Sequence, residues 1–188
     1  MPASTTSPET GARPEVITLA GGCFWCIEAV YALVDGVLSV ESGYAMGWVQ
    51  QPTYEQVCEG RTGHAEVVRV TFDAARISLE DVLEIFFVVH DPTTPNRQGH
   101  DVGPQYRSGI YTHAPAQEPV VRALLARMVP HFDAPIVTEV APEARYWPAE
   151  GYHQRYFEQH PGQGYCAYVI SPKLAKFRQR FAARVRPA

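Results

Sequence analysis

Residues 16–26 read VITLAGGCFWC, and this stretch decides how the rest of the chain is interpreted. The apolar, partly β-branched run from Val16 to Ala20 predicts a buried strand. Two glycines end it, and the apolar spacing from Phe24 onward predicts a helix over residues 24–34. Cys23 is therefore expected at a helix N-terminus. There the backbone N–H groups lack internal partners and carry partial positive charge.

The elements expected after this stretch follow the order β-α-β-β-α-β. Ser78 is a suitable N-cap for the second helix, with Asp81 completing a weak capping box. This order predicts an α+β fold, a ferredoxin-like two-layer α/β sandwich built on a split β-α-β unit, with C-terminal extensions. The expected elements are strands at 16–20, 37–44, 66–72 and 108–112, helices at 24–34 and 79–89, a loop carrying residues 53–55, and a long loop over 90–107.

The C-terminal extensions and the N-terminus complete the predicted organisation. A helix at 118–129, a strand at 136–140 and a short helix at 152–159 are expected, then a Gly- and Pro-rich tail holding Cys166 and a final basic helix. Residues 1–14 are rich in Ser, Thr, Pro and Gly and predict a disordered leader. Residues 15–188 are expected to form a single catalytic domain.

Composition narrows the functional class. The 188 residues carry a net charge of −4, which gives no indication of nucleic-acid binding. No apolar run reaches the ~18 residues that span a membrane. The N-terminus lacks the apolar region of a secretory signal. We therefore expect a cytoplasmic protein that is monomeric and binds neither nucleic acid nor membrane.

The four cysteines then become informative, since thiols stay reduced in the cytoplasm. A helix N-terminus lowers the pKa of a cysteine, so Cys23 is expected to be an exposed, reactive thiolate. Cys26 completes a Cys-x-x-Cys, which suggests redox chemistry. Cys26 also shares a helical face with Val30, so simple burial is an equal interpretation. Cys58 is expected only to pack.

A zinc site is the alternative chemistry. Residues 64–66, His-Ala-Glu, match the His-x-Glu of zinc deaminases, which pair it with a downstream Pro-Cys-x-x-Cys. Here the Cys-x-x-Cys lies upstream and no second ligand pair completes the set. We expect no metal. His64, His90 and His153 are expected to make structural hydrogen bonds.

Many short motifs follow one another along the chain. They are GCFW at 22–25, PTY at 52–54, TGHAEVV at 62–68, HDPTT at 90–94, NRQG at 96–99, DVG at 101–103, QYRS at 105–108, PAE at 148–150 and YHQ at 152–154. Together they resemble peptide methionine sulfoxide reductase A over about residues 16 to 160, in order and register, and so many motifs in series are highly specific. The chain departs from the family at Cys26, where many members have glycine. It also departs in the long loop, where Pro95, His100 and Pro104 stand in place of the expected Leu, Asn and Thr.

The resemblance implies an enzyme that reduces the S epimer of methionine sulfoxide, free or in proteins, and so repairs oxidative damage without a metal or organic cofactor. It implies that Cys23 attacks the sulfoxide sulfur and that Glu66 is the acid. A sulfoxide is a poor electrophile until its oxygen is protonated or hydrogen-bonded, so the acid is chemically required. The other implied roles are a methyl pocket from Phe24 and Trp25, oxygen contacts from Tyr54 and Tyr106, and a supporting role for Asp101.

Oxygen transfer leaves Cys23 as a sulfenic acid, which condenses with a second thiol. Cys166 is the predicted resolving cysteine, since it lies on a Gly-rich segment able to bend inward and the family often resolves from this region. Cys26, one helical turn from Cys23, is the competitor. The disulfide is expected to be reduced by thioredoxin as external reductant.

Two further interpretations stay open. One is a general disulfide oxidoreductase that uses Cys23 and Cys26 as its pair; it leaves Tyr54, Glu66 and Tyr106 unexplained. The other is a non-enzymatic zinc-binding module. Reduction of insulin disulfides would favour the first, and stoichiometric zinc in the purified protein the second.

Overall fold

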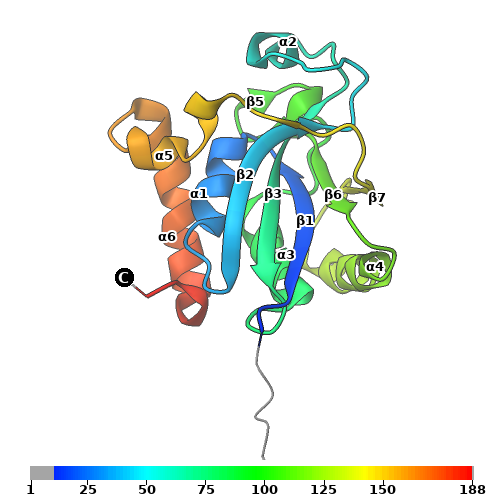
Figure 1. Cartoon of the computed structure of the whole chain (residues 1–188), viewed down its shortest axis with the longest axis vertical. Coiled ribbons are helices and arrows are strands. Elements are labelled where there is room, and N and C mark those ends of the chain that lie inside the picture. Colours follow the sequence, from blue (N-terminus) through cyan, green and yellow to red (C-terminus); the bar gives the residue numbers. More distant parts are fainter. Residues whose placement is uncertain (1–10, 188) are drawn as a thin grey trace, which may run out of the picture.

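A computed structural model describes residues 11–187, and Figure 1 shows a central sheet flanked by helices. Within these residues six strands form the sheet in the order β7-β6-β1-β3-β2-β8. β1 pairs antiparallel with β3 and β6, β2 pairs antiparallel with β3 and β8, and β7 runs parallel to β6. The strands are β1 (Pro14–Gly21), β2 (Val37–Ala45), β3 (Ala65–Asp73), β6 (Ser108–Thr112), β7 (Glu139–Pro142) and β8 (Trp147–Pro148).

The inner order β6-β1-β3-β2, with a helix after β1 and another after β3, confirms the predicted α+β, ferredoxin-like arrangement. β7 and β8 extend it at the two edges. The helices are α1 (Phe24–Tyr31), α2 (Tyr54–Cys58), α3 (Leu79–Val89), α4 (Gln117–Met128), α5 (Tyr156–Gln159) and α6 (Ser171–Arg180). Short 3-10 turns span Pro104–Tyr106, Val129–His131, Gly151–His153 and Ala182–Arg184, and a π-helical turn spans Cys166–Ile170.

The core lies between the sheet and the helices. Ile17 and Leu19 of β1 are fully buried, as are Val30 of α1 and Phe86 of α3. Each such side chain contributes about 1.5–3 kcal/mol relative to its exposed state. The buried side chains of β1, α1 and α3 thus pack in one apolar layer. This packing fixes the position of the β1–α1 junction.

Regular structure begins at Pro14, just before the predicted start at Glu15. The Arg13 N–H donates to Asp73 Oδ1 at 2.9 Å, so this end of β1 is attached to the turn after β3. The predicted leader lies outside the described residues as far as residue 10.

Several element predictions differ from the structure. The short helix expected over 152–159 is interrupted by Arg155, whose φ of +55° separates the 3-10 turn Gly151–His153 from α5. α1 ends at Tyr31, before the predicted end at residue 34. The loop expected around Tyr54 begins helix α2, because Thr53 and Gln56 form a capping box that the sequence analysis overlooked. The edge strand β7 starts at Glu139, later than the predicted residue 136.

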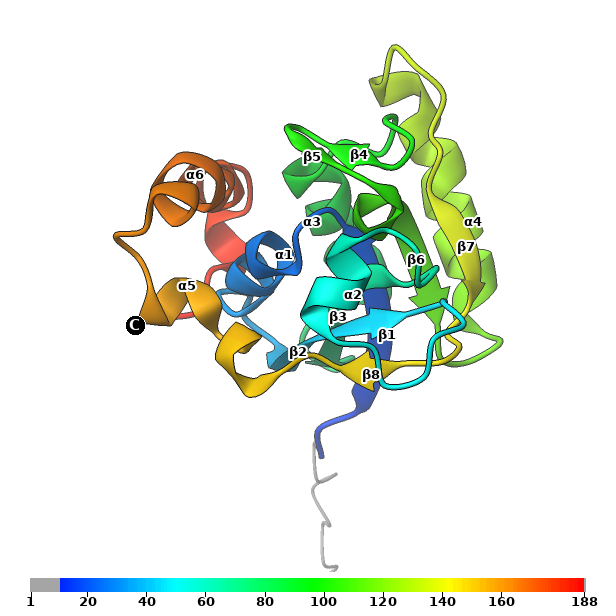
Figure 2. The same ribbon diagram turned by 90° about the horizontal axis from the view of Figure 1, so that it is seen from above.

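The long segment 90–107 is partly ordered by its own hairpin. β4 (Arg97–Gln98) and β5 (Asp101–Val102) pair antiparallel. Figure 2, seen from above, shows this hairpin, α2 and α5 around the start of α1. Across residues 11–187, none of the helices has both the length and the apolar character that crossing a membrane requires.

Candidate active site

The β1–α1 junction presents Cys23 as predicted, at the N-cap of α1. Gly22 has φ +89°, and a Cβ there would meet the Gln98 side chain at 2.6 Å, so only glycine suits this turn. The Cys23 side chain makes no capping hydrogen bond. Its thiol is therefore available for other partners.

Two expectations about Cys23 are wrong. The side chain is only 8% exposed, although the turn was expected to expose it. Burial, together with the neighbouring Cys26 thiol and the Glu66 carboxyl, raises the pKa of Cys23 well above its ordinary value. The desolvation cost of a buried thiolate outweighs the favourable helix terminus. Cys23 therefore rests as a thiol.

Glu66 of β3 lies directly beside this junction. Its Oε2 accepts a hydrogen bond from the Phe24 N–H at 3.0 Å. The residue is 2% exposed, and burial raises the pKa of its carboxyl to about 8. The resemblance implied that Glu66 is an acid, and a pKa raised toward neutral pH is compatible with that role. At neutral pH the site contains a carboxylic acid with a proton to donate.

An aromatic group surrounds the first turn of α1. Trp25 donates from Nε1 to His153 Nδ1 at 3.0 Å and stacks on Tyr156 with ring centroids 3.7 Å apart. Phe24 and Tyr54 also contact His153, at centroid distances of 5.1 and 4.4 Å. The predicted methyl-pocket residues Phe24 and Trp25 thus belong to one aromatic cluster, fixed by a histidine from the C-terminal extension.

Tyr54 and Tyr106 come from the first residue of α2 and from the turn before β6. Burial raises the pKa of both phenols, and the Glu66 carboxylate raises both further. Both hydroxyls therefore stay protonated at neutral pH and can donate. Tyr54 is held by its backbone N–H, which donates to Glu150 Oε2 at 3.1 Å.

Asp101, at the start of β5, accepts a hydrogen bond from the Tyr165 hydroxyl at 2.7 Å. The same hydroxyl lies 3.8 Å from Cys26 Sγ. The Asp101 carboxylate also contributes to the raised pKa of Glu66. The hairpin and the C-terminal segment thus meet at the start of α1.

The remaining cysteines differ in their surroundings. Cys26 is 1% exposed, and its interaction with the Cys23 thiol lowers its pKa to about 7. Cys166 is fully buried in a π-helical turn, so the expected Gly-rich tail is helical at this point. Cys58 was expected to pack but is exposed on α2. A five-residue helix at the surface leaves its last side chain in solvent.

The structure adds residues to the site that the sequence analysis did not assign to it. Glu150 binds the Tyr44 hydroxyl at 3.0 Å and the Tyr54 N–H. Tyr156 covers Trp25, and Tyr165 joins Asp101 to Cys26. The signal that was available for Glu150 was its place in the matching segment 148–150. No local pattern marks Tyr156 or Tyr165, since their roles arise from the C-terminal segment folding back over α1.

His64 and His90 make structural hydrogen bonds, which confirms their prediction. His64 accepts from the Gly47 N–H at 3.1 Å and contacts the Val49 carbonyl at 2.7 Å. His90 contacts the Phe86 carbonyl at 2.6 Å and the Ser108 hydroxyl at 2.8 Å. His153 holds Trp25 through Nδ1. Its buried Nε2 has no hydrogen-bond partner among residues 11–187 and lies 4.0 Å from Glu150 Oε2.

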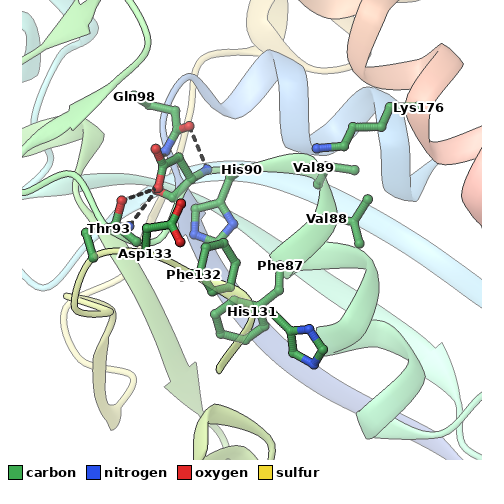
Figure 3. Close-up of a pocket in the computed structure, with 12 residues that line it drawn as sticks. Phe87, Val88, Val89, His90, Thr93, Gln98, His131, Phe132, Asp133 and Lys176 are labelled. Carbon is green, nitrogen blue, oxygen red and sulfur yellow. Dashed lines mark hydrogen bonds between the residues drawn. The ribbon is translucent and has the colours of Figure 1, made fainter. Parts of the chain in front are cut away.

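A cavity of about 530 Å³ lies beside His90, between α3, the segment after α4 and α6. Figure 3 shows His90 there with Phe87, Phe132 and Lys176 around it. Cys23 and Glu66 do not line this cavity. Within the described chain, no three His, Cys, Asp or Glu side chains gather as they would around a metal ion.

Comparison with known proteins agrees with this geometry. Residues 15–185 match the family described as peptide methionine sulfoxide reductase. The chain is 57% identical to the peptide methionine sulfoxide reductase MsrA of Ralstonia nicotianae, with 91% of this chain and 93% of that protein covered.

Solved structures from Saccharomyces cerevisiae are also similar. Mxr1 in its reduced form matches with a TM-score of 0.78 and 34% identity, over 87% of this chain and 96% of Mxr1. Mxr1 in complex with Trx2 matches with a TM-score of 0.56 and 26% identity, over 81% and 90%. The chain therefore belongs to the peptide methionine sulfoxide reductase family.

Proposed function

We propose that this protein reduces the S epimer of methionine sulfoxide, free or in oxidised proteins, with Cys23 as nucleophile and Glu66 as acid. The observation that carries the proposal is a protonated carboxyl beside a thiol. Glu66 has a pKa of about 8 and accepts a hydrogen bond from the N–H of Phe24, the residue after Cys23. An acid near neutral pH is what activation of a sulfoxide oxygen needs.

The first step transfers oxygen to sulfur. Cys23 Sγ, as thiolate, attacks the sulfoxide sulfur while Glu66 donates its proton to the sulfoxide oxygen. The S–O bond to methionine breaks, a Cys23 S–OH bond forms, and methionine leaves as the thioether. The methionine sulfur is reduced by two electrons and the Cys23 sulfur is oxidised by two. The proton that Cys23 loses replaces the one that Glu66 gives.

A Cys23 side chain that rests as a thiol is compatible with this order of steps. Because burial raises the pKa of Cys23, a proton acceptor or the bound substrate must favour the thiolate. Tyr54 and Tyr106 stay protonated and are proposed to donate to the sulfoxide oxygen. Phe24 and Trp25 are proposed to receive the substrate methyl group, and Asp101 to support the site.

We propose Cys26 as the thiol that condenses with the sulfenic acid on Cys23. The two lie one helical turn apart, and their thiols interact. The hydrogen bond with the Cys23 side chain lowers the pKa of Cys26, so the two sulfur atoms already lie close enough to interact. The Cys26 Sγ–Cys23 Sγ bond forms as the S–O bond breaks, and water leaves.

Cys166, the resolver predicted from the sequence, is the second candidate. One observation favours it, because its π-helical turn is a rare conformation that often occurs at functional sites. Burial and the nearby Cys26 thiol raise the pKa of Cys166, which disfavours the thiolate that an attack on Cys23 requires.

Thioredoxin is the proposed external reductant, supported by the similarity to Mxr1 in its complex with Trx2. Its dithiol would exchange with the enzyme disulfide and restore both cysteines. We propose that residues 15–188 act as one catalytic domain without a metal or organic cofactor. A cytoplasmic location and a monomeric state stay predictions.

The test is single-turnover and steady-state kinetics on a chiral methionine sulfoxide with serine variants of the cysteines. Cys23→Ser is expected to form no methionine, and retained turnover would overturn the proposal. Cys26→Ser should form one equivalent of methionine and then stop with thioredoxin. If Cys166→Ser gives that pattern and Cys26→Ser turns over normally, Cys166 is the resolver. Cys58→Ser is the matched control and should turn over normally.

A further inference from the structure

The Tyr165 hydroxyl connects two parts of the site that no sequence motif joined. It donates to Asp101 Oδ2 at 2.7 Å and lies 3.8 Å from Cys26 Sγ. Its ring meets Trp25 edge to face, with centroids 6.0 Å apart. Tyr165 directly precedes the π-helical turn, so the C-terminal segment delivers a polar group into the cysteine pair.

The hydrogen-bond directions follow from the chemistry of a phenol. Tyr165 has one hydroxyl proton, and a carboxylate can only accept. The proton therefore points at Asp101, which leaves the lone pairs of the phenol oxygen for the Cys26 S–H. The contacts form a chain from the Cys26 thiol through the Tyr165 hydroxyl to the Asp101 carboxylate.

We propose that Tyr165 relays the proton of Cys26 to Asp101 when Cys26 attacks the sulfenic acid on Cys23. This rests on the proposed function with Cys26 as resolver. As the Cys26 Sγ–Cys23 Sγ bond forms, the Cys26 proton passes to Tyr165 and the Tyr165 proton passes to Asp101. The S–O bond breaks, and the departing hydroxide takes a proton from Glu66 to leave as water. The proton that reached the neighbouring Asp101 balances the one that Glu66 gives. The disulfide and one water are the products, so no other oxidant or reductant is needed.

Burial makes such a relay useful. Cys26 is 1% exposed, so solvent bases have little access to its thiol. Asp101 is half-buried at the start of the hairpin and can exchange its proton with water. Burial and the nearby thiolates raise the pKa of Tyr165, so the phenol passes a proton on and does not remain a phenolate.

Two other roles for Tyr165 make different predictions. Tyr165 also interacts with Cys23 and lowers the pKa of that thiol. If that were its function, loss of the hydroxyl would slow methionine formation. If the ring were only a support for Trp25, removal of the hydroxyl alone would change neither step.

The test is Tyr165→Phe, which keeps the ring and removes the relay. Tyr168→Phe is the matched control, because it makes the same chemical change in the following turn at a side chain that is 85% exposed. In single turnovers, methionine release reports the first step. Trapping of the remaining sulfenic acid, with mass mapping of the disulfide, reports the second.

Tyr165→Phe is expected to form the disulfide ~100-fold more slowly, a typical contribution of proton transfer, and to slow methionine formation by a much smaller factor. Its disulfide step should gain a steeper rise with pH, as hydroxide replaces the relay. An unchanged disulfide rate, or an equal slowing of both steps, would overturn the proposal. If Cys26→Ser forms its disulfide at the wild-type rate, the resolver assignment itself has failed, whatever Tyr165→Phe does.

Discussion

Glu66 and His90 are both buried titratable residues. Burial shifts their pKa values in opposite directions, and the two side chains differ in their hydrogen-bond partners. Burial raises the pKa of Glu66 to about 8 and lowers that of His90 to about 4, so each is uncharged at pH 7. His90 has both ring nitrogens in contact with partners, the Phe86 carbonyl and the Ser108 hydroxyl. Glu66 accepts one hydrogen bond within residues 11–187, from the Phe24 N–H.

The difference separates a structural group from a reactive one. A fully paired buried histidine holds the end of α3 against β6 and has no free position for a ligand. A protonated carboxyl with one partner has a proton to give to whatever enters beside it. Buried titratable groups with strongly shifted pKa values concentrate at functional sites, and Glu66 has such a shift toward neutral pH.

The largest loss of activity is expected when the reactive carboxyl of Glu66 is replaced. Glu66→Gln keeps an oxygen for the Phe24 N–H and removes the acidic proton. General-acid catalysis contributes ~10²–10⁴-fold, so kcat/KM for methionine sulfoxide should fall by about that factor. Steady-state kinetics at pH 7 measure it. A loss below about tenfold would show that Glu66 is not the acid.

The same pair of enzymes tests the pKa of Glu66. The wild-type carboxyl is protonated below pH about 8 and ionised above it, so the fraction of enzyme with a usable acid falls as pH rises through about 8. For the wild type, kcat/KM should therefore fall as the pH rises through about 8. This fall should be absent in Glu66→Gln, whose residual activity should only rise with pH as Cys23 ionises.

A smaller effect is expected at the two phenols. Tyr54→Phe and Tyr106→Phe each remove one neutral donor and leave the ring, and a hydrogen bond of this kind contributes about 0.5–1.5 kcal/mol. Each variant should lose up to about tenfold in kcat/KM. The double variant should lose more than either alone. If neither variant changes kcat/KM, the sulfoxide oxygen does not lie between these hydroxyls.

The sequence predicted the positions of Cys23 and Glu66 in the fold well, because local patterns specify the elements that carry them. The strand–glycine–helix order placed Cys23, and the alternation of 66–72 placed Glu66 on the adjacent strand. Burial of Cys23 was missed, since it depends on residues distant in the sequence, of which Glu66 and Tyr165 interact with the Cys23 thiol. The same long-range packing makes the pKa of Cys23 rise where a helix terminus alone would lower it. Local rules do not contain that desolvation.

Replacement of the structural residue His90 should lower stability and leave catalysis nearly unchanged. His90→Leu removes the contacts with the Phe86 carbonyl and with Ser108, at a cost of about 1–3 kcal/mol. At ~2–4 °C per kcal/mol for a domain of this size, the melting temperature should fall by several degrees. Activity per folded molecule at 25 °C should stay within about twofold. A selective loss of kcat with an unchanged melting temperature would place His90 in the chemistry.

Replacement of Glu66 should also change the stability of the fold, because a catalytically impaired variant is expected to be more stable than the wild type. The folded pKa of Glu66 lies above its ordinary value of 4.5, so its contribution to stability is present below about pH 4.5 and is lost as pH rises through about 8. Gln does not ionise and loses nothing over that range. At pH 7, Glu66→Gln should therefore gain about 1 kcal/mol or more, with a melting temperature ~2–4 °C higher for each kcal/mol.

At pH 4 the gain should vanish, because Glu66 is protonated in both the folded and the unfolded chain. Glu59→Gln, at an exposed position just after α2, is the matched control and should show no comparable change. Thermal melts of the three proteins at the two pH values measure this. A gain of equal size at pH 4 would mean that packing, and not the buried carboxyl's proton, explains it. The stability data would then not support the distinction between Glu66 as an acid and His90 as a structural residue.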